Sequence, residues 1–138
     1  MKNNNSKYCG CVHQEHKEKN DSTAVLEEEH QVILRMLNYI EIGLKKLEDG
    51  KAINLTIFEN GIDFIRNFAD KCHHGKEEDL LFVKAIEKGI PKESGPIGMM
   101  LYEHELGREF IKKSSLALKN NKNKELIDNL RGYIYLMT

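Results

Sequence analysis

The sequence predicts an all-α fold, an antiparallel up-down four-helix bundle with a short fourth helix. Apolar residues recur every three or four positions over long stretches, which is the period of an amphipathic helix that packs nearly parallel to its neighbours. The only two prolines among the 138 residues, Pro91 and Pro96, lie within one six-residue stretch, so the rest of the chain is free to be helical. Short polar turns between the apolar stretches favour antiparallel neighbours.

Composition is that of one ordinary soluble domain, with 40% hydrophobic residues, 31% charged residues and a formal net charge of -1. This charge argues against a general attraction to nucleic acid or to an anionic membrane. No apolar run reaches the roughly 20 residues that span a bilayer, and the polar start MKNNNSKYCG lacks the apolar middle of a signal peptide. We therefore expect a cytoplasmic protein, with a flexible leader over residues 1–21 and a helical bundle domain over 22–138.

The first helix is expected to begin at Asp21 or Ser22, either of which can cap free backbone amides, and to end at Gly50. Its seam residues are spaced alternately by four and three positions: Leu26, His30, Ile33, Leu37, Ile40, Leu44 and Leu47. A histidine therefore occupies a position where an aliphatic residue is usual.

The second and third helices are expected on either side of the prolines. The second begins near Asn54 and ends at Gly89 and Pro91, because a proline disfavours helical geometry in the residue before it. Ser94 is expected to cap the third helix, with Pro96 in its first turn. The third apolar seam again contains a histidine: Ile97, Leu101, His104, Ile111 and Leu118.

The fourth helix follows a polar turn over residues 119–124. It has about 15 residues, against about 27 in the first helix, so at 1.5 Å per residue it is roughly 18 Å shorter. One wall of the bundle is therefore expected to be short.

Counting residues from each turn places three histidines and one carboxylate at one level, near the end where the first helix begins. His30 lies about 18 residues before the expected end of the first helix, and His73 lies about 19 residues after the expected start of the second. Glu77 lies about 11 residues before the end of the second helix, and His104 about 9 after the start of the third. Burying such groups without partners is costly, whereas a divalent metal satisfies all of them. The predicted metal ligands are His30, His73, Glu77 and His104.

Two adjacent histidines each have a glutamate four residues later, so the inward pair has to be chosen. At about 100° per residue from Ile65, His73 falls near 80° from the centre of the buried face and His74 near 180°. This geometry favours His73 with Glu77 as the inward pair. It assigns His74 and Glu78 to a solvated face or to contacts around the ligands.

Three strings, HQVILRML around His30, HHGKEEDLLF from His73 and GPIGMMLYEHE around His104, resemble the hemerythrin-like HHE cation-binding domain. The resemblance covers residues 22 to about 115. It implies a four-helix bundle that holds a non-haem di-iron centre with an oxo or hydroxo bridge, and the four predicted ligands match ligands of the family. Histidine and glutamate suit iron, and zinc or manganese can occupy the same atoms.

The resemblance further implies a protein that binds or senses dioxygen or a related small oxidant, and we favour such a binding role over catalysis. One alternative is a di-iron enzyme, or an iron-handling or iron-sulfur cluster repair protein, that acts on peroxide or nitric oxide. Another alternative is a metal-free helical interaction module. A bundle with an open apolar face can also pair as a homodimer.

The sequence departs from the family pattern at its C-terminal end. The family normally supplies two further ligands, a histidine and a glutamate spaced i, i+4, from its fourth helix. The level of His104 maps to about position 139 on that helix, and the sequence given ends at Thr138. We therefore expect an incomplete fourth helix. Either the sequence is a fragment or a naturally shortened form whose metal site is incomplete, or the missing ligands come from the leader or from another subunit.

The leader offers five side chains of the metal-binding type, although a disordered tail is favoured there. They are Cys9, Cys11, His13, Glu15 and His16. An odd number of cysteines without an export signal argues against a structural disulfide framework. Cys72, on the buried face of the second helix, is therefore expected to be a small core residue.

Overall fold

The computed structural model describes residues 22–90 and 95–138, and within these ranges the chain forms helices joined by turns, with no strand. The predicted all-α class is confirmed for this part of the chain. The leader expected over residues 1–21 and the residues Pro91 and Ser94 lie outside the described ranges.

The first rod of the bundle is α1 (Ser22–Glu48), whose limits agree with those expected from the sequence. Gly50 follows it with a φ of 71°, a left-handed conformation that glycine adopts without steric penalty. The second rod then starts where the Asn54 side chain accepts a hydrogen bond of 3.0 Å from the backbone amide of Thr56. An Asn two residues before the first helical amide thus caps the helix.

The second rod is one continuous helix from residue 56 to residue 87, but its winding changes along its length. Two of its four segments are π-helical, with hydrogen bonds from residue i to i+5 and therefore more residues in each turn. In chain order the segments are α2 (Thr56–Phe64), η2 (Ile65–His74), η3 (Glu77–Leu81) and α3 (Phe82–Glu87). Gly89, with a φ of 92°, ends the rod.

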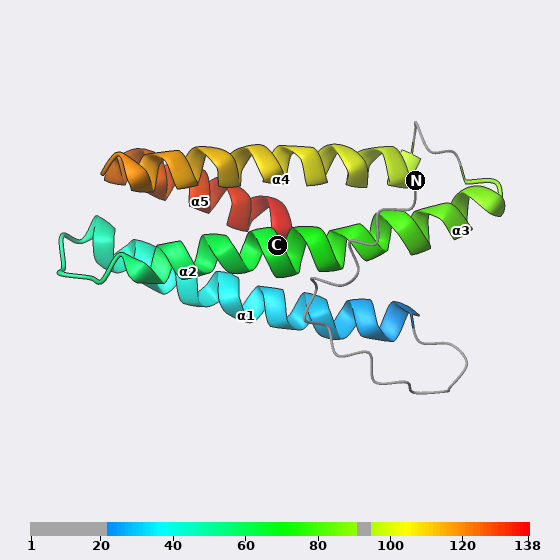
Figure 1. Ribbon diagram of the computed structural model, residues 1–138, viewed down its shortest axis with the longest axis horizontal. Coiled ribbons are helices and arrows are strands. Elements are labelled where there is room, and N and C mark those ends of the chain that lie inside the picture. The colour runs from blue at the N-terminus through cyan, green and yellow to red at the C-terminus, as the bar shows by residue number, and fades with distance from the viewer. Residues whose placement is uncertain (1–21, 91–94) are drawn as a thin grey trace.

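The other two rods are α4 (Gly95–Lys119) and α5 (Asn123–Met137). In Figure 1 the turn between α4 and α5 lies at the same end of the bundle as the connection between α1 and α2. The end of α3 and the start of α4 lie at the opposite end. With 15 residues against 27 in α1, α5 is the short helix that the sequence predicts, and it stops part-way along the bundle.

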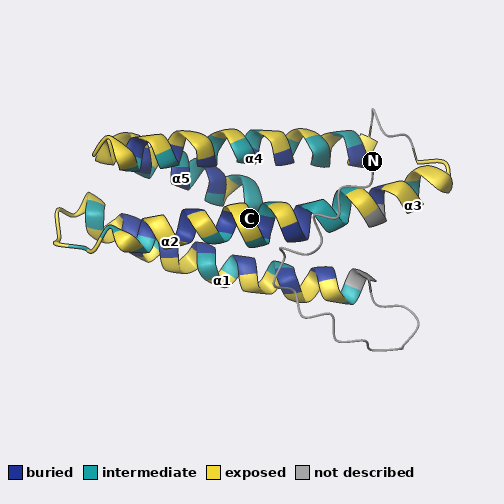
Figure 2. Cartoon of the chain, in the orientation of Figure 1, coloured by how far each residue is buried: buried dark blue, intermediate teal, exposed yellow. Residues whose placement is uncertain are grey.

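The core runs along the inward faces of all four rods, which carry the buried residues in Figure 2. The predicted seam of α1 is confirmed at Ile33, Leu37, Ile40 and Leu44, which are at most 2% exposed. Opposite them lie Phe58, Ile62 and Ile65 of the second rod, and Leu126, Leu130 and Tyr133 of α5. At Gly61 the rods approach so closely that an added Cβ atom would lie 2.7 Å from Ile40 Cδ1.

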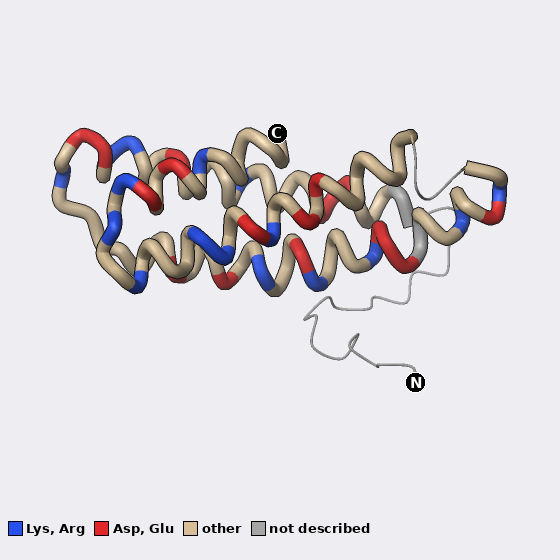
Figure 3. The backbone as a smooth tube through the Cα atoms, turned by 90° about the horizontal axis from the view of Figure 1, so that it is seen from above, with Lys and Arg blue, Asp and Glu red and all other residues tan. Residues whose placement is uncertain are grey.

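Positions of both basic and acidic residues are spread along the length of the bundle in Figure 3. Among the described residues, no helix combines the length and the apolar character needed to cross a bilayer.

Candidate metal centre

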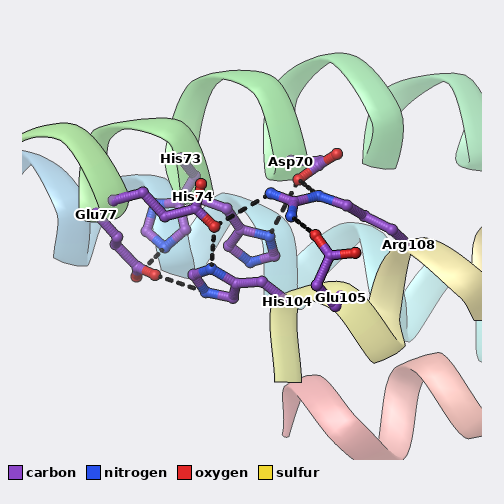
Figure 4. Close-up of polar contacts among 8 residues, drawn as sticks. Asp70, His73, His74, Glu77, His104, Glu105 and Arg108 are labelled. Carbon is purple, nitrogen blue, oxygen red and sulfur yellow. Dashed lines mark hydrogen bonds and ion pairs between the residues drawn. The ribbon is translucent and has the colours of Figure 1, made fainter. Parts of the chain in front are cut away.

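A carboxylate from the second rod lies between two imidazoles from different rods (Figure 4). Glu77, in η3, has one oxygen 3.0 Å from Nε2 of His73, in η2, and its other oxygen 3.0 Å from Nε2 of His104, in α4. The side chains of His73 and His104 are 3% and 6% exposed, and that of Glu77 is 14% exposed. Three of the four predicted ligands therefore meet inside the bundle.

His74 also belongs to this cluster. Its side chain is buried, and its ring stacks on that of His104 with a centroid distance of 4.0 Å. His74, Glu77 and His104 each offer one ligand atom, and these three atoms lie within 4.8 Å of one another. The expectation that His74 occupies a solvated face is therefore wrong.

The winding of η2 explains why both adjacent histidines face inward. The sequence prediction applied the α-helical rotation, whereas a π-helix turns by only about 85° per residue, because each turn contains more residues. Counted from Ile65, this rotation moves His73 and His74 to about 40° on opposite sides of the centre of the buried face. With the α-helical rotation of about 100° per residue the same two positions lie near 80° and 180° from that centre, so His74 would face away from the core.

His30, the predicted ligand from α1, lies beside His73 with the two ring centroids 5.9 Å apart. It is half-buried, and it lies outside the group formed by His74, Glu77 and His104. The structure therefore brings His30 next to the cluster without bringing it into direct contact with Glu77. Its role as a ligand stays a prediction, as does that of the other three.

Sequence reasoning missed a buried acid on α1. Glu29 is 8% exposed, and one of its oxygens is 2.9 Å from Nζ of Lys76. The other oxygen is 3.8 Å from Nδ1 of His73. The apolar spacing of α1 includes position 30. It therefore predicted His30, and not the adjacent Glu29, as the inward-facing polar residue.

An arginine on α4 links two carboxylates that flank the cluster. Arg108 donates from Nε to Asp70 at 2.8 Å and from Nη2 to Glu78 at 3.2 Å, and it also pairs with Glu105 (Figure 4). The Glu78 oxygen that accepts from Arg108 is 3.1 Å from Nδ1 of His104. Asp70 in turn lies 3.8 Å from Nδ1 of His74.

The sequence prediction allowed for contacts of Glu78 around the ligands, and its 3.1 Å contact with His104 bears this out. It missed the contacts of Asp70 and Arg108, although their spacing was visible. Asp70 precedes His74 by four residues, and Arg108 follows His104 by four, so each pair shares a helix face. That signal alone is common in helices and does not identify a site.

The electrostatics of the cluster follow from burial and from these contacts. Burial alone would raise the pKa of Glu77, but hydrogen bonds from His104 and His73 outweigh it and lower the pKa from 4.5 to about 2. Burial would lower the pKa of His104, but Glu77 and Glu78 outweigh it and raise the pKa. For His74, burial lowers the pKa despite the contact with Asp70.

Both ring nitrogens of His104 lie within hydrogen-bond distance of a carboxylate, Nε2 at 3.0 Å from Glu77 and Nδ1 at 3.1 Å from Glu78. A carboxylate only accepts hydrogen bonds, so the protonated imidazole, with an N–H on each nitrogen, suits this position. Without a metal, His104 therefore serves as a cation between two acids.

The cluster fits a bound transition metal. His74, Glu77 and His104 offer three ligand atoms within 4.8 Å of one another, and Nε2 of His73 faces the same carboxylate. The buried Nδ1 of His73, on the side of Glu29, has no hydrogen-bond partner among the described residues. Imidazole nitrogens and carboxylate oxygens are the donors that iron, zinc and manganese accept in proteins. His73, His74, Glu77 and His104 would hold the metal, and Glu78 and Asp70 would orient the rings.

The expectation for the cysteines is confirmed only in part. Cys72 is a buried core residue, as expected, but it is also disulfide-bonded, which the argument against a disulfide framework did not anticipate. The five candidate ligands of the leader, at positions 9, 11, 13, 15 and 16, lie outside the described residues.

A family model, the hemerythrin HHE cation binding domain, matches residues 21–137. The chain belongs to the hemerythrin HHE family. No curated protein and no solved structure matches it. Membership of this cation-binding family agrees with the cluster of histidines and glutamate inside the bundle and identifies the cluster as its candidate metal site.

Proposed function

We propose that this hemerythrin-family protein holds a non-haem di-iron centre in an antiparallel up-down bundle. There it would bind or sense dioxygen or a related small oxidant in the cytoplasm. The observation that carries the proposal is the position of Glu77, between the Nε2 atoms of His73 and His104 at 3.0 Å from each. Proposed ligands are His73, His74, Glu77 and His104, with His30 as a further ligand beside His73.

The contacts of Glu77 support a site with two metal ions. Its two oxygens face histidines from two different rods, as do those of a carboxylate that joins two ions in a helical bundle. His74 adds a nitrogen on the side of His104, and His30 adds one on the side of His73. The donors are thus distributed on both sides of one carboxylate.

Bound iron would supply an open coordination position for a small oxidant. The chain contributes the surroundings of that position. Glu78 and Asp70 orient the rings of His104 and His74, and Arg108 holds both acids in place. The buried residues around the cluster exclude bulk water, which protects bound oxidants from protons.

The available space favours a small ligand. The cavity that reaches His74 and His104 has a volume of about 260 Å³. Pockets that hold drug-sized molecules usually measure about 300 to 1,000 Å³. A small ligand suits this space better than a drug-sized organic substrate.

Anaerobic loading with Fe(II), followed by measurement of iron per chain and exposure to air, tests the proposal. We expect about two iron ions per chain and a visible absorption band that appears on exposure to air. Glu77→Gln and His104→Ala should lose this iron, whereas Glu59→Gln, an exposed acid on the same rod, should retain it.

Failure to bind iron, zinc or manganese near stoichiometry would overturn the proposal and favour the metal-free interaction module. A single ion per chain would contradict the di-iron assignment. Catalytic turnover of peroxide or nitric oxide by the iron-loaded protein would assign the site to the enzymatic alternative.

A further inference from the structure

A cavity of about 260 Å³ lies between η2, α4 and α5, next to the candidate metal centre. Exposed residues on its lining are Arg66 and Lys112, and buried ones include His74, His104 and Tyr133. The cavity therefore extends from charged side chains at the surface to a tyrosine of the core.

Tyr133 has an unsatisfied polar group. The residue is 2% exposed, it lines the cavity, and its hydroxyl has no hydrogen-bond partner among the described residues. Burial, with a smaller contribution from Asp70, raises the pKa of Tyr133, so the phenol keeps its proton and is available as a donor. A buried hydroxyl without a protein partner is rare, so the Tyr133 hydroxyl can donate to an acceptor in the cavity, either a water molecule or a bound ligand that displaces it.

The charges around the cavity indicate the sign of that acceptor. Three permanent cations line it, Arg66, Arg108 and Lys112, against one carboxylate, Asp70. Asp70 is already paired with Arg108 at 2.8 Å. Arg66 and Lys112 form no ion pair within residues 22–90 and 95–138, so their charge is available to a ligand. A cavity lined by excess positive charge attracts small anions.

We propose that this cavity binds a small anion, a monocarboxylate or oxyanion about the size of acetate. The anion accepts a hydrogen bond from the Tyr133 hydroxyl and is attracted by Arg66 and Lys112. A water molecule takes about 30 Å³ of liquid volume, so the cavity accommodates an ion of this size with some of its hydration. The residues that bind it are not proposed metal ligands, so the site does not depend on the di-iron proposal.

The test uses the full chain, freed of metal with EDTA and titrated with sodium acetate at constant ionic strength. Acetamide, which has nearly the same shape without the charge, is titrated in parallel. The reporter is the NMR signal of the Gly107 backbone amide, because Gly107 lines the cavity. We expect a saturable shift with acetate and none with acetamide.

Two variants and their matched controls assign the contacts. Tyr133→Phe keeps the ring and should weaken acetate binding by about tenfold or more, since it removes a hydrogen bond to a charged group. Tyr135→Phe, at an 86% exposed tyrosine of the same helix, should leave it unchanged. Arg66→Gln with Lys112→Gln should weaken binding and reduce its salt dependence. The control pair, Arg35→Gln with Lys45→Gln, removes the same amount of charge from α1. It should change neither the acetate affinity nor its salt dependence.

Circular dichroism of each variant shows that the bundle has folded before binding is compared. The proposal is overturned if acetate gives no saturable shift, if acetamide binds equally well, or if Tyr133→Phe binds acetate with unchanged affinity. Because the titration is done without metal, a failure of iron uptake leaves its result intact. Conversely, a failure to bind acetate does not affect the iron proposal.

Discussion

The rings of His74 and His104 lie face to face, with their centroids 4.0 Å apart and their planes 14° apart. The two residues come from different rods, so this contact joins η2 to α4 at the level of the candidate metal centre. It also brings a nitrogen of His74 within 4.8 Å of a carboxylate oxygen of Glu77 and of a nitrogen of His104. His74 thus packs between two rods and is also a proposed metal ligand, and mutation can separate the packing contact from the proposed ligand role.

His74→Phe keeps an aromatic ring in the stack but removes both nitrogens. We expect the bundle to stay folded and iron affinity to fall by about tenfold or more, since a ligand should contribute at least as much as the residues that orient it. Iron titration of His74→Phe and of His30→Phe compares the ligand assigned from the structure, His74, with the ligand predicted from the sequence, His30. The variant with the larger loss of iron affinity identifies the more important ligand. Wild-type affinity in the His74 variant would remove His74 from the ligand set.

Acid should weaken the metal-free protein through Glu77. Its pKa is about 2 in the folded protein against an ordinary value of 4.5, so its contribution to stability is complete above about pH 4.5. That contribution, about 3 kcal/mol at most, is lost as the pH falls from about 4.5 towards 2. Urea unfolding with EDTA at several pH values should show the stability gap between wild type and Glu77→Gln narrowing over this range. A gap that does not change with pH would contradict the low pKa.

Two glycines of the second rod should respond in opposite ways to alanine. At Gly61 an added Cβ would meet Ile40 Cδ1 at 2.7 Å in the core, so Gly61→Ala should destabilise the bundle by about 1–3 kcal/mol. At Gly75 the nearest atom is 3.8 Å away, so Gly75→Ala should gain helix propensity and stabilise by about 0.5–1 kcal/mol. Thermal unfolding of both variants checks this, and equal effects would show that the rods are less closely packed at Gly61.

Arg108 should influence metal affinity although it is not a proposed ligand. Arg108→Gln leaves Glu78 and Asp70 without their common cation, so the rings that they orient should bind iron about tenfold less tightly. The control is Arg131→Gln, because Arg131 is equally exposed, at 34%, and also pairs with two acids, Glu41 and Glu48. Equal losses of iron affinity in the two variants would show a general effect on the fold.

The helices could be predicted closely because their signals are local. An Asn or Ser before a helix, a glycine after it and an apolar residue every three or four positions depend on nearby residues only. The limits of α1 and the short α5 follow from such signals. The level of His73, Glu77 and His104 could also be predicted, because residues counted from a turn measure height along a straight bundle.

The orientation of His74 could not be predicted in the same way. It depends on the π-helical winding of η2, whereas the sequence prediction applied the α-helical rotation. The contacts of Arg108 with Asp70 and Glu78 likewise join two rods. The spacing of residues within one helix does not show which side chains of a neighbouring helix they will contact. The disulfide at Cys72 was missed. An odd number of cysteines argues against a framework in which all of them are paired, but it does not exclude one disulfide bond.

The cationic form of His104, between Glu77 and Glu78, has a consequence for how the protein matures. A proton at this position supplies the positive charge between two acids that a bound metal would otherwise supply. Binding of a metal ion through His104 would therefore displace this proton, so acidification and metal shortage would shift the same equilibrium in the same direction.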